Sequence, residues 1–274
     1  MIYIWLAIAV ALMVLVLFLF KGRRNHPKLT ELRKWSYAHR GLHNAELPEN
    51  SMAAFRAAVE AGYGIELDIH LMKDGKLAII HDASLKRTAG VDVKIEDLCA
   101  EDLENYHLEG TEEKIPLFTS FLEMVDGKVP LVVELKCERS NYNALCTAAC
   151  EILDGYHGLY CVESFDPRCI RWLRKKRPEF VRGQLSQRYS RKDRAIPGIL
   201  RFVLRNNLLN CLTNPDFVAY RFSERKNLGN LICRKLWGVQ GVTWTIRSEE
   251  DYNSALAEDW IPIFENFKPE KQTH

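Results

Sequence analysis

Residues 64–70 read GIELDIH, a short apolar stretch that carries two carboxylates, Glu66 and Asp68, toward its C-terminal end. The stretch has the length and composition of a β-strand. Side chains two positions apart on a strand point to the same side, so Glu66 and Asp68 are expected to face one way together. This segment and others like it decide the predicted fold.

Short apolar segments recur along the chain, and helical patterns lie between several of them, as over residues 51–61, 143–153 and 167–176. Strands that alternate with helices are typical of a parallel sheet and of the α/β class. The segments that we expect to be strands are Trp35–His39, Gly64–His70, Leu77–His81, Val129–Lys136, Leu159–Ser164, Arg182–Leu185, Asp216–Arg221, Gly241–Ile246 and Ile261–Phe264.

The chain has 274 residues, and about 250 follow an apolar N-terminal stretch, which is the usual size of a TIM (β/α)₈ barrel. We therefore predict this barrel, although nine candidate strands are one more than it needs. The polar, acidic residues 84–116 are expected to form a short insertion after strand three. Residues 187–215 mix basic and apolar side chains, and they either lie on a membrane surface or form a helix that covers the barrel.

The N-terminal residues 2–20 are apolar without a break, and Lys21, Arg23 and Arg24 follow them at once. A helix of this length spans about 28 Å, close to the thickness of a bilayer's hydrocarbon core. A cleaved signal peptide would carry its positive charge before the apolar run rather than after it. The pattern predicts one N-terminal transmembrane helix that is not removed.

We accordingly expect a transmembrane anchor over residues 1–21, a linker over 22–33 and a TIM-barrel domain over 34–274. Positive charge favours the cytoplasmic side of a membrane, so the predicted location is a cell membrane, crossed once, with the catalytic domain in the cytoplasm. The opposite orientation is the alternative. Eight cysteines without a CxxC pair favour free thiols in a reducing compartment, which agrees with the cytoplasmic placement.

Overall charge argues against a nucleic-acid partner, because 38 basic residues nearly balance 36 acidic ones. The informative charges lie instead at the C-terminal ends of the first four predicted strands. In a TIM barrel these ends converge on one mouth, which holds the active site. Any one of these residues alone could have an ordinary structural role. A purely structural explanation of the whole set would require four strands to have gained charged side chains at the same end independently of one another. The four ends read His39-Arg40, Glu66-Leu67-Asp68, His81-Asp82 and Glu134-Leu135-Lys136.

Three of these side chains, Glu66, Asp68 and Glu134, are expected to face one cavity. Carboxylates in that position repel one another unless a cation lies between them. A hard divalent ion with oxygen ligands, Mg²⁺ or Ca²⁺, is the natural occupant. Arg40 offers a planar fork suited to a phosphate, and Lys136 adds a point charge. The sequence therefore predicts a site for a phosphoryl anion.

Two histidines complete the predicted site. An imidazole changes its charge near neutral pH, so His39 and His81 suit a general acid and a general base. His70 shares a strand face with Glu66 and Asp68, which makes it either a further ligand or, as we favour, a spacer. His43, in the loop after the first strand, is expected at the surface.

The order of these motifs resembles that of the glycerophosphodiester phosphodiesterases, from about residue 36 to about residue 267. The segments that carry the resemblance are His39-Arg40-Gly41, Pro48-Glu49-Asn50-Ser51, Gly64-Ile65-Glu66-Leu67-Asp68, Lys73-Asp74-Gly75, His81-Asp82, Glu134-Leu135-Lys136, Ser164-Phe165-Asp166 and Trp244-Thr245-Ile246. Among them, Asn50 or Ser51 is expected to cap a helix, with Asn50 also close to the site. Trp244 either lines the mouth or fills the core.

The resemblance implies metal-dependent hydrolysis of glycerophosphodiesters to sn-glycerol 3-phosphate and an alcohol. It assigns metal binding to Glu66, Asp68 and Glu134, acid–base catalysis to His39 and His81, and phosphate binding to Arg40 and Lys136. One divalent cation is implied, and no obligate protein partner is expected. One segment departs from the family pattern, because Pro262–Pro269 reads PIFENFKP, and this departure is not expected to affect the seven site residues.

Two other functions remain open. A lysophospholipase D that acts on lysophospholipids at the bilayer would explain the predicted anchor and the basic, apolar residues 187–215. A non-catalytic, membrane-tethered scaffold that binds phosphate is the second alternative. We expect such a scaffold to have lost one or more polar site residues, and this chain has lost none.

Overall fold

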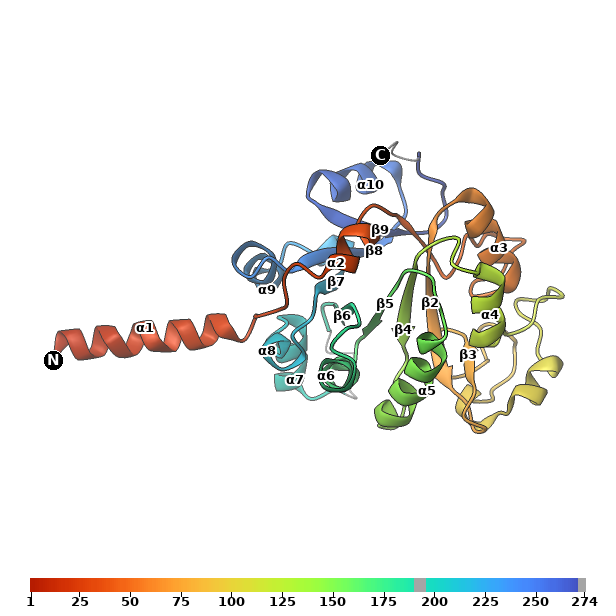
Figure 1. Cartoon of the computed structure of the whole chain (residues 1–274), viewed down its shortest axis with the longest axis horizontal. Coiled ribbons are helices and arrows are strands. Elements are labelled where there is room, and N and C mark those ends of the chain that lie inside the picture. The colour runs from red at the N-terminus through yellow and green to blue at the C-terminus, as the bar shows by residue number, and fades with distance from the viewer. Residues whose placement is uncertain (190–195, 271–274) are drawn as a thin grey trace.

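The computed structural model describes residues 1–189 and 196–270 (Figure 1). Eight parallel strands form a closed barrel, because the sheet runs β1-β9-β8-β7-β6-β5-β4-β2 and β1 pairs with β2. The predicted TIM barrel is confirmed. The barrel strands are β1 (Tyr37–His39), β2 (Gly64–Leu71), β4 (Leu131–Leu135), β5 (Tyr160–Ser164), β6 (Arg182–Ser186), β7 (Phe217–Arg221), β8 (Gln240–Ile246) and β9 (Trp260–Phe264).

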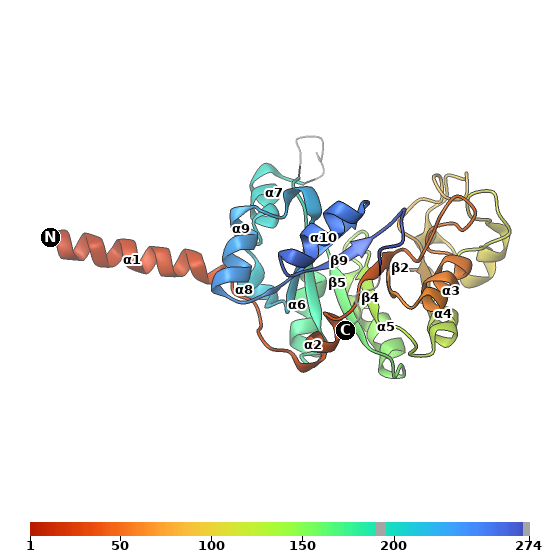
Figure 2. The ribbon, with the colours of Figure 1, turned by 90° about the horizontal axis from the view of Figure 1, so that it is seen from above.

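Helices connect the strands and surround the barrel (Figures 1 and 2). The α-helices are α1 (Ile2–Phe18), α2 (Pro27–Leu32), α3 (Met52–Ala61), α4 (Phe118–Val125), α5 (Tyr142–Asp154), α6 (Pro167–Lys176), α7 (Gly198–Arg205), α8 (Asn210–Thr213), α9 (Leu228–Leu231) and α10 (Glu249–Ala257). Shorter helical turns are η1 (Ile95–Asp97), η2 (Ala100–Asn105), η3 (Phe222–Glu224) and the π-helical η4 (Ile232–Leu236).

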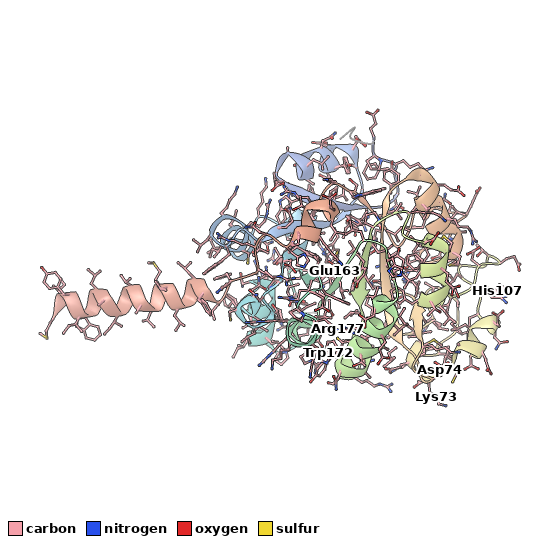
Figure 3. All side chains as sticks on the ribbon, in the orientation of Figure 1. Lys73, Asp74, His107, Glu163, Trp172 and Arg177 are labelled. Carbon is pink, nitrogen blue, oxygen red and sulfur yellow. The ribbon has the colours of Figure 1, made fainter. Side chains whose placement is uncertain are left out.

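The surplus strand of the prediction is the third one. β3 (Leu77–Ile79) pairs with β2 in the antiparallel direction, so the expectation of a parallel barrel strand was wrong. The tight turn at Lys73 and Asp74 reverses the chain at the edge of the molecule, where Gly75 has a φ of +83° (Figure 3). A chain that turns back on itself within a few residues can only form a hairpin, whereas a parallel neighbour needs a long crossover.

The insertion therefore begins with β3 rather than after it. It has a small core of its own, in which Met72, Ala78 and Ile80 pack with Ile95 and Leu103 from η1 and η2. Lys73 N donates to Leu98 O at 2.9 Å and Ile79 N donates to Pro116 O at 2.8 Å, so the turn before β3 and the edge of β3 that faces away from β2 are both bonded to the insertion. This packing fixes the residues that follow β3.

Alternation along the strands separates apolar from charged side chains inside the barrel. In β4, Leu131 and Val133 pack outward against the helices, whereas Val132 belongs to the apolar cluster inside the barrel. Glu134 and Lys136 follow Val132 by two and four residues, so their side chains also point into the barrel, nearer the carboxyl end of the strand. The barrel interior is thus apolar below and charged at its mouth.

The N-terminal helix α1 extends away from the barrel in both views (Figures 1 and 2), and none of its 17 residues is buried. It ends at Phe18 because the chain then turns onto the barrel, where Phe20 packs against Val218 and Val239. Within residues 1–189 and 196–270, no helix combines the length and the apolar character that crossing a membrane requires. The predicted transmembrane helix is therefore not found.

The residues between α1 and β1 are attached to the barrel. Arg23 forms a salt bridge with the buried Asp216, with Nε 2.5 Å from Oδ1, and its Nη2 also donates to Phe180 O at 2.7 Å. Leu29 and Leu32 of α2 pack into the apolar cluster inside the barrel. This segment therefore closes the end of the barrel that lies opposite the mouth.

Candidate active site

Three carboxylates meet at the mouth of the barrel, as the sequence predicts. Glu66, Asp68 and Glu134 each place one oxygen within 4.8 Å of the other two, and all three residues are buried. Parallel pairing explains the meeting, because Asp68 and Glu134 are direct neighbours in the register of β2 and β4. An all-oxygen, buried and negatively charged cluster fits Mg²⁺ or Ca²⁺.

Electrostatics at these carboxylates support the same fit. Burial, followed by repulsion from Asp68 and Glu134, raises the pKa of Glu66 well above its ordinary value. Burial also raises the pKa of Glu134 to about 7, although Lys136 offsets part of that effect. Asp68 is the exception, since Lys136 and Arg40 outweigh its burial and hold its pKa well below the usual range. A bound cation would favour the ionised form of the cluster, which binding requires.

The two predicted phosphate ligands lie against these carboxylates. Lys136 Nζ is 2.7 Å from Glu134 Oε1 and 3.0 Å from Asp68 Oδ1. Arg40 Nε is 3.3 Å from Asp68 Oδ2, and the Arg40 backbone N–H donates to Glu66 Oε2 at 3.1 Å. Both cations are mostly buried, so they face the space that the carboxylates enclose rather than bulk water.

His39 lies at the end of β1, with its imidazole between two carboxylates. Its Nδ1 is hydrogen-bonded to Glu265 Oε2, and its Nε2 is 3.9 Å from Glu66 Oε2. Burial lowers the pKa of His39, and the hydrogen bond with Glu265 offsets part of that shift. Arg247 in turn donates to Glu265 Oε1 from Nε at 2.8 Å. Glu265 therefore orients the ring so that Nε2 faces the metal-binding cluster.

His81 has the same kind of support from a different part of the chain. Its Nδ1 is 2.6 Å from Asp82 Oδ1, and Arg87 Nε donates to Asp82 Oδ2 at 2.6 Å. Arg87 also donates to Glu49 at 2.6 Å, and Glu49 accepts from Arg40 at 2.9 Å. Each histidine thus has Nδ1 held by a carboxylate that an arginine holds in place. A fixed Nδ1 partner sets the tautomer and leaves Nε2 for proton transfer.

His81 reaches the mouth by a route that the sequence did not predict. Because β3 is antiparallel to β2, it runs toward the barrel from the insertion rather than up from the bottom of the barrel. Ile80 N donates to Asp68 O at 3.0 Å, and His70 Nε2 donates to His81 O at 3.1 Å. The prediction placed His81 correctly but for the wrong reason. His70 is bonded to backbone, in keeping with the favoured spacer interpretation.

Several residues near the site were missed or misjudged. Glu265 was assigned no role, and the departure of its segment from the family pattern was wrongly expected to leave the seven site residues unaffected. His43 was expected at the surface, but its Nε2 lies 3.7 Å from Glu265 Oε2. Asn50 lies close to the site, as predicted, because its Nδ2 donates to Asp68 Oδ2 at 2.9 Å. Ser51 is the helix cap, and its side chain accepts from Ala54 N.

Glu163 is a fourth buried carboxyl inside the barrel (Figure 3), and it pairs with Glu134 in the register of β4 and β5. Burial, followed by repulsion from Glu134, raises its pKa well above the ordinary value. The inward phase of β5 could have revealed Glu163, because it lies two positions after the inward Cys161.

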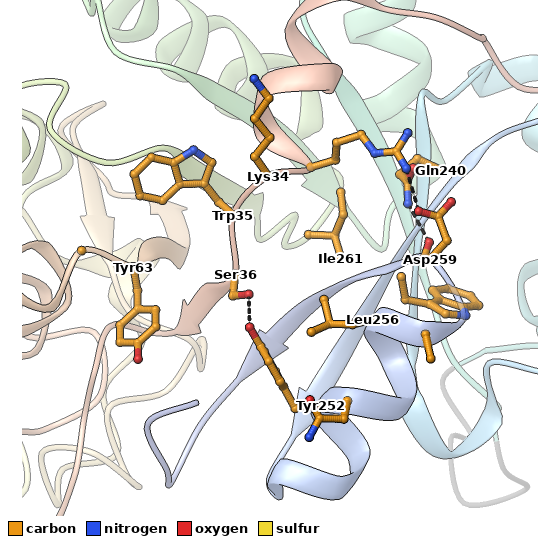
Figure 4. Close-up of a pocket in the computed structure, with 14 residues that line it drawn as sticks. Lys34, Trp35, Ser36, Tyr63, Gln240, Tyr252, Leu256, Asp259 and Ile261 are labelled. Atoms are coloured by element: carbon orange, nitrogen blue, oxygen red, sulfur yellow. Dashed lines mark hydrogen bonds and ion pairs between the residues drawn. The ribbon is translucent and has the colours of Figure 1, made fainter. Parts of the chain in front are cut away.

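Two cavities lie at opposite ends of the barrel. One of about 450 Å³ lies at the carboxyl ends of β7 and β8, lined by Arg221, Phe222, Trp244 and Arg247. Trp244 therefore lines the mouth, with its ring edge-on to Phe165 at 5.7 Å. A second cavity, of about 790 Å³, lies at the other end of the barrel beside Ser36 and Tyr252, whose hydroxyls are 2.7 Å apart (Figure 4). That end of a TIM barrel does not carry catalytic groups.

The charged mouth defines the class of protein. Clustered carboxylates suited to a hard cation, beside an arginine, a lysine and two oriented imidazoles, match what the cleavage of a phosphoric diester needs. The family follows directly, because the sequence model of the glycerophosphoryl diester phosphodiesterase family matches residues 39–266. The chain belongs to this family of phosphodiester hydrolases.

Individual relatives agree with this membership. The chain is 36% identical over 113 residues to a glycerophosphodiester phosphodiesterase of Bacillus altitudinis, a match that covers 39% of this chain and 46% of that protein. It is 35% identical over 132 residues to a lysophospholipase D of Rattus norvegicus, covering 43% of this chain and 40% of that protein. These matches span less than half the length of either relative.

A solved structure extends the likeness over more of the chain. The crystal structure of a glycerophosphodiester phosphodiesterase from Thermotoga maritima has a TM-score of 0.64 and 27% sequence identity to this protein. The match covers 84% of this chain and 93% of that one. The barrel of this protein therefore resembles that of the Thermotoga maritima structure over almost its whole length.

Proposed function

We propose that the protein hydrolyses glycerophosphodiesters to sn-glycerol 3-phosphate and an alcohol, with the help of one divalent cation. The observation that carries the proposal is the meeting of Glu66, Asp68 and Glu134 within 4.8 Å of one another, beside His39. Family membership over residues 39–266 supports the same reaction class.

The proposed mechanism assigns a task to each group. Glu66, Asp68 and Glu134 would hold the cation, Mg²⁺ or Ca²⁺, which supplies Lewis-acid stabilisation of charge on the phosphoryl oxygens. Arg40 and Lys136 bind the non-bridging oxygens of the phosphate, and in doing so they shift from the carboxylates that they contact in this structure.

Proton transfer falls to the two imidazoles. In an in-line displacement at phosphorus, the nucleophilic oxygen loses a proton while the leaving alkoxide gains one. His39 and His81 both present Nε2 with Nδ1 already bonded to a carboxylate, so one accepts the first proton and the other donates the second. Burial lowers the pKa of both rings, which favours the neutral form that the base needs, whereas the acid enters the reaction with a proton on Nε2, and the carboxylate bonded to its Nδ1 stabilises that charged form.

Hydrolysis of glycerophosphocholine and glycerophosphoethanolamine by the full chain tests this function. We expect release of sn-glycerol 3-phosphate that EDTA abolishes and added Mg²⁺ or Ca²⁺ restores. His39→Ala and Glu66→Ala should each lower kcat/KM by about 10²- to 10⁴-fold. His107→Ala and Glu46→Ala, which change exposed residues outside the site, are the matched controls. Folded protein that releases nothing from either diester with added metal would contradict the proposal.

A second candidate function is lysophospholipase D activity at a membrane. It is supported by the likeness to the lysophospholipase D of Rattus norvegicus and by apolar side chains, such as Phe202 and Leu228, that are exposed near the mouth. Comparing kcat/KM for lysophosphatidylcholine and for glycerophosphocholine separates the two functions. A clear preference for the lysolipid would favour the second candidate.

The location that we propose is a cell membrane, with the barrel on the cytoplasmic side and α1 in contact with lipid. The support is the exposure of the apolar side chains of α1 and the basic residues that follow it, of which Lys21 and Arg24 are exposed. Fractionation of cells that produce the full chain tests the location. Recovery in the soluble fraction at low and at high salt would contradict it.

A further inference from the structure

Exposed hydrophobic side chains gather on one face of the barrel. Beyond residues 1–18, the large hydrophobic side chains exposed in the described part of the chain all lie on α7, α8, α9 and η4, except Val91. Ile199 is 84% exposed, Leu228 68% and Phe202 61%, so these side chains project almost fully into solvent. We call this set the apolar face; it consists of Ile199, Leu200, Phe202, Leu212, Leu228, Leu231 and Leu236.

The helices of the apolar face form one continuous surface. Asn207, after α7, donates from Nδ2 to Oδ1 of Asn230 in α9 at 2.8 Å. Gly229 lies so close to α7 that a Cβ at this position would meet Asn206 O at 2.5 Å. α7 is also held from beneath, because Ser186 donates to Leu204 O at 2.8 Å. The apolar side chains therefore belong to helices that are bonded to the barrel and to one another.

The same face surrounds the base of α1. Cys211 N, in α8, donates to Leu19 O at 3.0 Å, and Trp237 Nε1 donates to Leu17 O at 2.8 Å directly after η4. In both views α8 and α9 lie on the side of the barrel from which α1 extends (Figures 1 and 2). The exposed side chains of α1 and those of the apolar face thus adjoin.

The charge of this face selects its partner. Residues 197–240 contain seven basic residues, namely Arg201, Arg205, Arg221, Arg225, Lys226, Arg234 and Lys235, against two acids, Asp216 and Glu224. Asp216 is buried and paired with Arg23, and Arg225 is buried and paired with Glu258, so neither adds much charge to the surface. Lys226 and Lys235 are exposed beside Leu228 and Leu236. Apolar side chains bordered by cations match the surface of an anionic bilayer.

We propose that the apolar face lies on an anionic lipid bilayer, so that the barrel meets the membrane with its side. α7 and α9 follow the carboxyl ends of β6 and β7, and this orientation therefore brings the rim of the mouth to the lipid headgroups. The cavity lined by Arg221, Phe222 and Trp244 lies at this rim, at the carboxyl ends of β7 and β8. The inference goes beyond the proposed reaction, since lipid contact is measured without turnover.

Amide hydrogen exchange of the full chain tests the proposal, with vesicles of phosphatidylcholine and with vesicles that also contain phosphatidylglycerol. We expect the anionic vesicles to slow exchange in 198–205 and 228–236 but not in α3 or α4. Binding through α1 alone would leave both segments unprotected and would overturn the proposal. Self-association through these helices without lipid, seen by sedimentation, would also overturn it.

Variants give a second readout. Phe202→Asp with Leu228→Asp should weaken partitioning onto anionic vesicles by about tenfold or more, whereas Val91→Asp, at an exposed apolar position far from this face, should not. Hydrolysis of glycerophosphocholine by the same variants reports whether the barrel is folded. Should the double variant fail to fold, Lys226→Glu with Lys235→Glu replaces it, with the same expected loss. Unchanged partitioning of a folded variant would overturn the proposal.

Discussion

Nδ1 of His39 and Oε2 of Glu265 are hydrogen-bonded although 226 positions separate the two residues in the chain. His39 ends β1 and Glu265 follows β9, and the barrel closes by pairing these two strands. Burial would raise the pKa of Glu265, but the hydrogen bonds from His39 and His43 hold it well below its ordinary value. Glu265 is therefore an ionised carboxylate that positions the imidazole.

Glu265→Gln should lower kcat/KM by about 100-fold with little change in KM, because an amide can present its N–H to Nδ1 and favour the wrong tautomer. The pH profile of kcat/KM should also shift, since the carboxylate raises the pKa of His39. Steady-state kinetics on glycerophosphocholine measures both effects. Glu46→Gln, at an exposed position, is the control. An unaltered pH profile would assign Glu265 a structural role only.

Metal affinity should fall as the pH is lowered through about 7. Glu134 has a pKa of about 7, and a protonated carboxyl is a poor ligand, so protons compete with the cation below that value. Titration calorimetry with Mg²⁺ and with Ca²⁺ at about pH 8 and about pH 6 measures the effect. Glu134→Gln should bind about 10- to 100-fold more weakly and with a flatter pH dependence. Equal affinity at both pH values in the unaltered protein would refute the assignment.

Glu163→Gln should change kcat/KM by no more than about twofold and unfolding free energy by less than about 1 kcal/mol. Burial raises the pKa of Glu163 well above its ordinary value, which favours the neutral carboxyl, and an amide has almost the same shape as that form. Denaturant unfolding and steady-state kinetics measure the two quantities beside Glu134→Gln. A loss as large as that of Glu134→Gln would mean that Glu163 is ionised and takes part in the site.

Stability should decline between about pH 6.5 and about pH 4 because of His70. Burial lowers the pKa of His70 to about 4, while the unfolded chain keeps the ordinary value of 6.5. In this window the unfolded state binds the proton and the folded state does not, so stability rises with pH, and this histidine accounts for about 3 kcal/mol. Denaturant unfolding of His70→Gln should show a flatter pH dependence, while His107→Gln should match the unaltered protein. Identical slopes for all three proteins would refute the assignment.

Local patterns were enough to predict the barrel and most of its site. The period-two spacing of Glu66 and Asp68, and of Glu134 and Lys136, places each pair on one side of a strand, whatever the rest of the fold does. Parallel strands then bring their carboxyl ends together, which is why three carboxylates met as expected. These inferences rest on strand geometry alone and need no knowledge of long-range contacts.

The tertiary structure decided the features that depend on contacts between segments far apart in the chain. The direction of β3 followed from the hairpin and from its bonds to Pro116, and these brought His81 to the mouth from the insertion side. The length of α1 followed from the packing of Phe20 against Val218, which ends the helix after 17 residues.

Glu265 shows most clearly the difference between what local sequence patterns predict and what the tertiary structure decides. Its segment departs from the family pattern, and nothing in PIFENFKP points to a histidine 226 positions away. Closure of the barrel between β1 and β9 places the two side chains together. The sequence determined which side chains each strand presents, through the fixed periodicity of the backbone. Which carboxylate holds which imidazole was decided by strand order and closure, because contacts between distant segments exist only once the chain has folded.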